Sequence, residues 1–256
     1  MSAIAVTQGG VARSEWIKLR TLRSTVLTYL FALGALVGVG LLATLAAVAR
    51  WESMSAPERE GVAINAHALA GADLAQLAIG VVGVIAISGE YTTGMIRSTL
   101  AAVPTRLPVL WAKLGVLCAT TFALMLPASF VVYLAGNAIM SQHWHERLMD
   151  PGIPRVVAGT AVLLTGVCAL GVALGFILRS TAGAIATLFG ILLVLPLVGQ
   201  FVPKVGPYLP SGTMDAFTSL HNDPTVLAPW TGLALFVGYV VVAIAGAAVV
   251  LMRRDA

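Results

Sequence analysis

Few side chains in this chain of 256 residues have types and spacing suited to chemistry. Asp73, Gln76, Gly80 and Gly83 recur at helical spacing, so a helix would carry them on one face. A face of polar and small residues meets another helix or a wet cavity rather than lipid. An acid inside a membrane-spanning helix is costly and suggests function. Asp73 is expected near the end of its helix on the outer side of the membrane. At that position a structural or interfacial role explains the acid at least as well as contact with a substrate.

The common signatures of nucleotide and hydrolytic chemistry are missing from the sequence. It contains no GxxxxGK[ST] phosphate loop, no HExxH motif and no GxSxG motif. His143 and His145 form only a weak metal-ligand pattern, and no metal site is predicted. Cys118 and Cys168 lie in apolar runs and are interpreted as small buried hydrophobic side chains. The chain is expected to hold no cofactor and to be no enzyme by itself.

The elements that must position these residues are membrane spans. Hydrophobic residues make up 59% of the chain and charged residues only 10%, whereas soluble proteins carry about 25% charged residues. A span needs about 20 mostly apolar residues. Six runs qualify, at Thr25–Ala49, Ala68–Ser88, Val109–Ala135, Val156–Leu178, Ala182–Val202 and Trp230–Met252. The prediction is an all-α, polytopic membrane protein in which residues 1–256 form a single domain.

The distribution of Lys and Arg predicts the orientation in the membrane. With the N-terminus in the cytoplasm, ten of the 15 basic residues fall on the cytoplasmic side and five on the outer side. Positive residues favour the cytoplasmic side. Both termini are therefore expected in the cytoplasm, in a multi-pass protein of the cell membrane. The basic residues flank apolar spans, so they indicate orientation and not nucleic-acid binding.

The segment before the first span has the pattern of a helix lying in the cytoplasmic interface. Its apolar side holds Trp16 and Leu19, while Lys18 and Arg20 fall largely on the opposite side. Such a helix buries its apolar face in the acyl boundary and turns its bases toward anionic head groups. The alternative interpretation is that the segment Val11–Ser24, which includes Arg23, is a plain basic flank of the first span.

A second helix is expected in the connection between the second and third spans, GEYTTGMIRSTLAAVPTRLP. It would begin near Glu90 and end near Pro104. A partly apolar knob on it, made of Tyr91, Met95, Ile96 and Thr99, suits docking into a groove on a partner. An ordinary solvated loop is the alternative.

Two further features concern the later spans. One or two short helices are expected in the proline-rich residues 203–229, either on the outer surface or dipping back into the membrane. Gly171 and Gly175 predict close helix packing in the fourth span. Pro127 and Pro196 are candidates for kinks in the third and fifth spans.

Taken together, these segments resemble the ABC-2 type permease subunits of actinobacteria. SEWIKLRTLRST at Ser14–Thr25 is similar to the start of such permeases. GEYTTGMIRSTLAAVPTR at Gly89–Arg106 is similar to their first cytoplasmic loop, and YLPSG at Tyr208–Gly212 lies where they carry outer re-entrant helices. The Gly89–Arg106 stretch is the most specific part of a likeness that covers the whole chain in its layout.

The resemblance implies a permease for drugs, lipids or peptides that is driven by separate ATPase subunits. Those subunits would bind ATP and Mg²⁺, and a second permease copy or paralogue would complete a dimer. The resemblance also assigns three sets of residues. An elbow helix would hold Trp16, Lys18, Leu19, Arg20 and Arg23, and a coupling helix would present Glu90, Tyr91, Met95, Ile96 and Thr99 to the ATPase. Asp73, Gln76, Gly80 and Gly83 would line the substrate path or the dimer seam.

Two other classes of protein compete with this interpretation. A membrane-embedded enzyme needs convergent catalytic groups at one depth, and no such group is evident. The other class is an ion-coupled transporter or a structural membrane subunit. Ion-coupled transporters typically have paired ionisable residues inside their spans together with internal repeats, and the sequence shows neither.

Overall fold

The computed structural model describes residues 7–55, 59, 64–103, 105–141, 148–220 and 226–253, and these residues form helices and no strand. Six helical segments are long and apolar enough to cross a membrane. They comprise α2 (Arg23–Arg50) with the short 3₁₀ turn η1 (Trp51–Ser53), α5 (Ala72–Thr92), α7 (Leu107–Met140), α8 (Ile153–Leu178), the segment Thr181–Phe201, and α12 (Pro229–Arg253). The prediction of an all-α membrane protein with six spans is confirmed.

The fifth span is not a uniform helix. It consists of α9 (Thr181–Phe189), a π-helical turn η2 (Gly190–Val194) and α10 (Leu195–Phe201). Pro196 lies in the first turn of α10, directly after η2. Proline has no backbone N–H and cannot donate a hydrogen bond to the preceding turn, so a regular α-helix is interrupted at this point. The expected irregularity at Pro196 therefore takes the form of a π-helical turn. Pro127, by contrast, lies inside the continuous helix α7.

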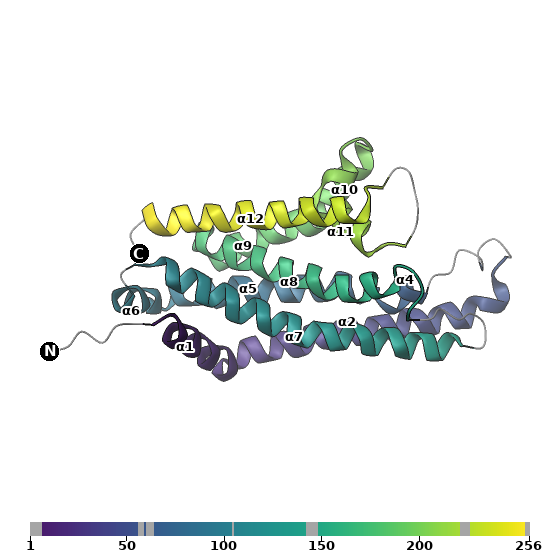
Figure 1. Ribbon diagram of the computed structural model, residues 1–256, viewed down its shortest axis with the longest axis horizontal. Helices are drawn as coiled ribbons and strands as arrows, with labels where there is room; N and C mark the ends of the chain where they lie inside the picture. The colour runs from purple at the N-terminus through teal and green to yellow at the C-terminus, as the bar shows by residue number, and fades with distance from the viewer. Residues whose placement is uncertain are drawn as a thin grey trace.

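The spans run side by side, and the shorter helices gather at the two ends of the bundle (Figure 1). One end carries α1 (Gln8–Thr21), α6 (Met95–Ala102) and the last turn of α12, and we call it the α6 end. The opposite end carries α4 (Ile64–Ala68), the 3₁₀ turn η3 (Gly206–Tyr208) and α11 (Pro210–Thr218), and we call it the α11 end. One of the helices expected between the fifth and sixth spans is thus α11.

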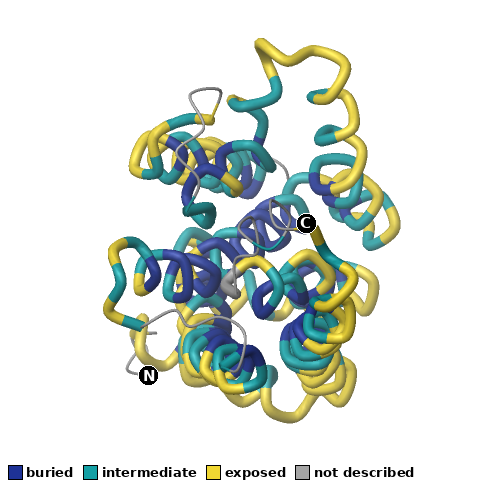
Figure 2. Tube along the Cα trace, turned by 90° about the vertical axis from the view of Figure 1, so that its right-hand side faces the viewer, coloured by how far each residue is buried: buried dark blue, intermediate teal, exposed yellow. Residues whose placement is uncertain are grey.

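Helix α8 is the centre of the bundle. In its most apolar stretch 67% of the residues are buried, against 17% in Thr181–Phe201 and in α12. Viewed along the helix axes, buried positions face the middle of the bundle and exposed positions form its rim (Figure 2). The fifth and sixth spans therefore keep wide apolar faces that the described part of this chain leaves uncovered.

Close packing of α5 on α8 depends on glycine. A methyl group at Gly83 would overlap the carbonyl oxygen of Cys168, and one at Gly171 would overlap the carbonyl oxygen of Gly80. Gly175 likewise lies against Ile87. Small residues let two membrane helices approach to backbone contact. The close packing predicted for Gly171 and Gly175 is confirmed, and Gly80 and Gly83 belong to the same contact.

The second span differs from its predicted bounds at both ends. It begins at Ala72 rather than Ala68, because residues 69–71 form a turn between α4 and α5. It continues to Thr92 rather than Ser88. Asp73 consequently lies in the first turn of α5, and Glu90 lies inside its last turn.

Candidate functional site

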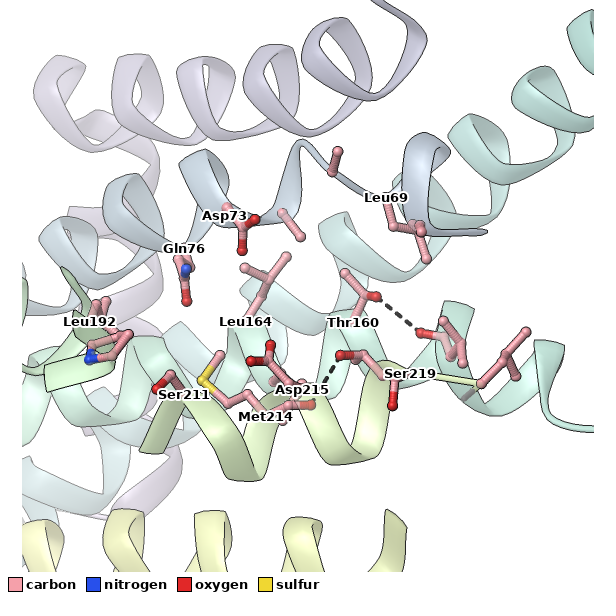
Figure 3. A pocket seen from close by; sticks show the side chains of 18 of the residues that line it. Leu69, Asp73, Gln76, Thr160, Leu164, Leu192, Ser211, Met214, Asp215 and Ser219 are labelled. Carbon is pink, nitrogen blue, oxygen red and sulfur yellow. Dashed lines mark hydrogen bonds between the residues drawn. The ribbon is translucent and has the colours of Figure 1, made fainter. Parts of the chain in front are cut away.

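A cavity of about 600 Å³ opens at the α11 end, between α5, α8, α11 and the irregular fifth span (Figure 3). Its volume falls within the range of about 300–1,000 Å³ that is typical of small-molecule sites. Its apolar lining includes Leu163, Leu164, Leu192, Leu193 and Met214. The polar lining consists of Asp73, Gln76, Thr160, Ser211, Asp215, Thr218 and Ser219. The cavity therefore suits an amphipathic ligand.

The start of α5 positions Asp73 and Gln76 on one side of this cavity. Asp73 lies in the first turn of α5, where the helix dipole favours a negative charge. Gln76 follows one turn later, and both side chains point toward the cavity (Figure 3). The polar face predicted for the second span thus divides into two parts. Asp73 and Gln76 line the cavity, whereas Gly80 and Gly83 pack against neighbouring helices.

Helix α11 positions Asp215 on the other side. Its buried face, with Thr213 and Phe217, packs against α8 and α12, and Phe217 contacts the ring of Trp230. The guanidinium of Arg155 on α8 donates hydrogen bonds to the carbonyl oxygens of Phe217 and Ser219. These bonds satisfy carbonyl groups at the C-terminal end of α11. Because the opposite face of the helix is held in this way, Asp215 is directed into the cavity (Figure 3).

The cavity has a negative electrostatic character. The side chains of Asp73 and Asp215 are both exposed on the wall of the cavity. The surrounding protein and the charge of Asp73 nevertheless raise the pKa of Asp215 to about 6. No Lys, Arg or His is found among the described residues that line the cavity. Within the described chain, the Asp73 and Asp215 carboxylates also take part in no ion pair. Two carboxylates therefore face each other there without a countercharge from the lining.

A second polar site lies at the α6 end, where four charged side chains alternate in sign. The Nζ atom of Lys113 on α7 lies 2.6 Å from Oε2 of Glu15 on α1 and 2.8 Å from Oε1 of Glu90 on α5. Lys18 Nζ lies 2.8 Å from Oε1 of Glu15 and 2.7 Å from the same Glu90 oxygen. We call Glu15, Lys18, Glu90 and Lys113 the charge ring.

The charge ring borders a cavity of about 350 Å³, and its Lys18 is half-buried. Lys113 is 2% exposed, and Glu15 and Glu90 are also buried. Lys113 in addition donates to the carbonyl oxygen of Ala86. Burial lowers the pKa of Lys18, but its hydrogen bonds to Glu15 and Glu90 outweigh that effect and hold the pKa above its usual value. The four groups cancel in charge, so the ring joins α1, α5 and α7 without an uncompensated buried ion.

Helix α6 follows the ring directly. Gly94 separates it from α5 and adopts a left-handed conformation with φ of 74°, which glycine reaches without strain. Met95 is 46% exposed, whereas Ile96 is 2% exposed and packs against the bundle. Arg97 and Ser98 are exposed, and Thr99 is half-buried. One face of α6 thus anchors the helix and the other is open to a partner.

The prediction for this connection was wrong in two respects. The helix begins at Met95 and not near Glu90, which belongs to α5 and to the charge ring. Ile96 is no part of an exposed knob, because it faces inward. Tyr91 is half-buried, and the guanidinium of Arg179 lies 5.1 Å from the centre of its ring. Pro104 lies outside the described residues.

The predicted interfacial segment is the helix α1, with one change of face. Trp16 is exposed, as expected for contact with lipid, and the Arg20 guanidinium lies 5.9 Å from the centre of its ring. Leu19 is half-buried. Lys18, however, was expected to face head groups and instead points to Glu15 and Glu90, since ion pairing is stronger in that protected position. Arg23 is the first residue of α2.

Sequence reasoning overlooked Glu15, Lys113 and Asp215. Lys113 carried a signal, because an ionisable residue within an apolar run suggests a buried partner. Asp215 carried none, since it lies in a semi-polar connection. Among the described residues, no group of three or more His, Cys, Asp or Glu is arranged to hold a metal ion. His143 and His145 lie outside the described residues.

The two sites occupy opposite ends of one helix. Asp73 and Glu90 are separated along α5 by 17 residues, or about 25 Å at the rise of an α-helix. Neither a family model nor a curated protein matches the chain. Any functional assignment therefore depends on the cavity, the charge ring and the helix between them.

Proposed function

We propose that this chain is the membrane-spanning permease subunit of an ATP-driven ABC exporter. The observation that carries the proposal is the position of α6. This short helix offers an open face at one end of the bundle, and only Thr93 and Gly94 separate it from α5. In the proposal the α6 end lies in the cytoplasm, and α6 receives a separate ATPase subunit.

The charge ring supports this role for α6. A force applied to α6 reaches α5 through two residues, and the ring connects the last turn of α5 to α1 and α7. Breaking such buried ion pairs is costly, so the three helices move together. Helix α5 then carries the displacement along its length to the first turn, where Asp73 borders the cavity.

The cavity supports the export of a hydrophobic or amphipathic substrate. Its apolar side accepts the body of the substrate, and its carboxylates and hydroxyl groups fix the orientation. An ATPase that binds ATP differently in two arrangements of the permease would shift the cavity between those arrangements. The sequence has no phosphate loop, so ATP and Mg²⁺ belong to the partner ATPase subunits in this proposal.

A second permease copy or a paralogue completes the proposed transporter. The fifth and sixth spans have wide exposed apolar faces, with Leu197, Phe201 and Val242 among the exposed side chains. Either lipid or the second permease covers such faces. In this proposal the cell membrane is the site of action, and no nucleic acid takes part.

The proposal is tested by coexpressing the tagged chain with a phosphate-loop ATPase encoded beside its gene. We expect the ATPase to copurify, and Met95→Asp to abolish copurification because it places a charge on the open face of α6. Ile96 is unsuitable for this test because its side chain is buried. Met149→Asp is the matched control, since Met149 is 84% exposed outside the helices. Transport by the purified chain without ATP or a partner would contradict the proposal.

A further inference from the structure

The cavity at the α11 end combines an apolar side with negative charge, and this combination restricts the ligands that fit. Its apolar lining comes mainly from α8 and the fifth span, with Met214 of α11, and its two carboxylates come from α5 and α11. Figure 3 shows Asp73 and Asp215 on opposite sides of the space, each directed into it. A ligand that fills the cavity therefore lies against leucine side chains and between two acids.

The surroundings of Asp215 leave its charge without compensation. Asp215 lies in the last turn of α11, where the helix dipole disfavours a negative charge. Arg155 on α8 is directed to the carbonyl oxygens of Phe217 and Ser219, and no ion pair joins it to Asp215. From α5, the group that faces Asp215 is another acid, Asp73. A positive charge placed between the two carboxylates would offset the unfavourable helix dipole at Asp215 and the repulsion between Asp215 and Asp73.

We propose that the cavity binds an amphipathic organic cation, with its positive group between Asp73 and Asp215 and its apolar body against Leu164 and Leu192. This inference rests on the proposed function, for which it names the class of substrate. An anionic amphiphile is rejected, because the described lining offers it no positive group. A neutral amphiphile of equal size binds more weakly, since it gains only the apolar contacts.

The shape of the cavity favours an organic cation over a bare metal ion. A calcium ion takes six to eight oxygen ligands at about 2.3–2.6 Å, so it needs a compact shell of oxygen atoms. The cavity instead encloses about 600 Å³, and leucine and methionine side chains form much of its wall. Only a cation that carries a sizeable hydrophobic body fills this volume and contacts the apolar side chains of the wall.

The experiment uses tetraphenylphosphonium, a permanent cation surrounded by apolar rings, and tetraphenylborate, an anion of nearly the same shape. Each is titrated separately, by isothermal calorimetry at pH 7.5, into the purified full-length chain in nanodiscs of zwitterionic lipid. We expect saturable binding of the cation at one site per chain and no saturable binding of the anion. Asp73→Asn and Asp215→Asn keep the side-chain shape, and each is expected to weaken cation binding about tenfold.

Glu52→Gln is the matched control, because Glu52 is an exposed acid in η1 that does not line the cavity. Its affinity for the cation should stay within twofold of the unmodified chain. Equal affinity in both Asp variants and the unmodified chain, equal binding of the anion, or displacement of the cation by millimolar Ca²⁺ would each overturn the inference. A second series, Leu164→Ala and Leu192→Ala, should weaken binding of the cation as the apolar side is lost, and unchanged affinity there would also overturn it.

These measurements separate the inference from the proposed function. Cation binding is assayed without any ATPase, whereas the permease role is assayed by copurification through α6. A chain that binds the ATPase but not the cation keeps the permease role and loses the substrate class. A chain that binds the cation but no ATPase keeps the cavity as a cation site and loses the proposed energy source.

Discussion

Replacing Lys113 by methionine tests whether the charge ring holds the α6 end together. Lys113 is the most deeply buried member and contacts two carboxylates at 2.6 and 2.8 Å. Methionine has a similar length, so the change removes the charge with little change in volume. It leaves Glu15, Lys18 and Glu90, with a net charge of −1, and both carboxylates of this group are buried.

The expected loss of stability is large because two buried carboxylates lose a partner at once. Breaking a buried ion pair by removal of one partner costs about 3–5 kcal/mol. Lys18 still compensates one carboxylate, so the lower part of this range, about 3 kcal/mol, is expected. The free energy of unfolding is measured by titration with sodium dodecyl sulfate in mixed micelles, followed by circular dichroism.

A double-mutant cycle distinguishes the loss of charge balance from a loss of packing. Glu90→Gln in the Lys113→Met background restores a neutral ring that contains Glu15 and Lys18. The double variant should therefore be more stable than the sum of the two single losses by about 1–3 kcal/mol. Arg13→Met, on the exposed side of α1, is the control and should change stability by less than about 0.5 kcal/mol. Additive losses, or a Lys113→Met variant as stable as the unmodified chain, would refute the reasoning.

Two further predictions concern the cavity and the α5–α8 contact. The pKa of Asp215 is about 6 in the folded chain, against 3.8 for a free Asp side chain, so the folded state binds this proton more tightly than the unfolded state. The free energy of unfolding therefore falls as the pH rises from about 4 to 6. Asp215→Asn should then unfold at a higher temperature than the unmodified chain at pH 7 and at the same temperature at pH 4, and tetraphenylphosphonium binding to the unmodified chain should weaken as the pH falls through 6. A binding curve that is flat with pH would contradict the assignment of Asp215. Gly171→Val should lower the free energy of unfolding by more than about 2 kcal/mol because its side chain would overlap the backbone of α5, whereas Gly238→Ala, with open space around it, should be neutral or slightly stabilising. Unfolding titrations check both variants, and a stable Gly171→Val chain would show that α5 and α8 do not pack this closely.

The spans were predictable because hydropathy over about 20 residues is a local property of the sequence. The packing of Gly171 and Gly175 was predictable for a similar reason, since a small residue every fourth position marks a close helix contact. Asp73 and Gln76 were recognised as a polar face from spacing alone. For these residues, the periodicity within a single helix is sufficient to predict which face of the helix they share.

The rest of the candidate site depends on contacts between distant segments. Glu15 and Lys113 are 98 residues apart, and hydropathy does not indicate which acid a buried lysine will meet. Glu90 was placed on the wrong helix because α5 continues past Ser88, and its burial among Lys18 and Lys113 compensates its charge there. Asp215 became part of the cavity only because Arg155 and Phe217 fix the orientation of α11, and these contacts arise from the tertiary fold.

The two ends of α5 have a thermodynamic consequence if the helix moves as one body. A partner on α6 that changes the affinity of the cavity for its ligand by some factor must have its own affinity changed by the same factor when that ligand binds. This reciprocity allows a readout at one end of the molecule to report on the other. The change in ATPase affinity on addition of the ligand would thus measure, without any transport assay, the coupling free energy between the two ends of α5, from Asp73 to Glu90, 17 residues apart.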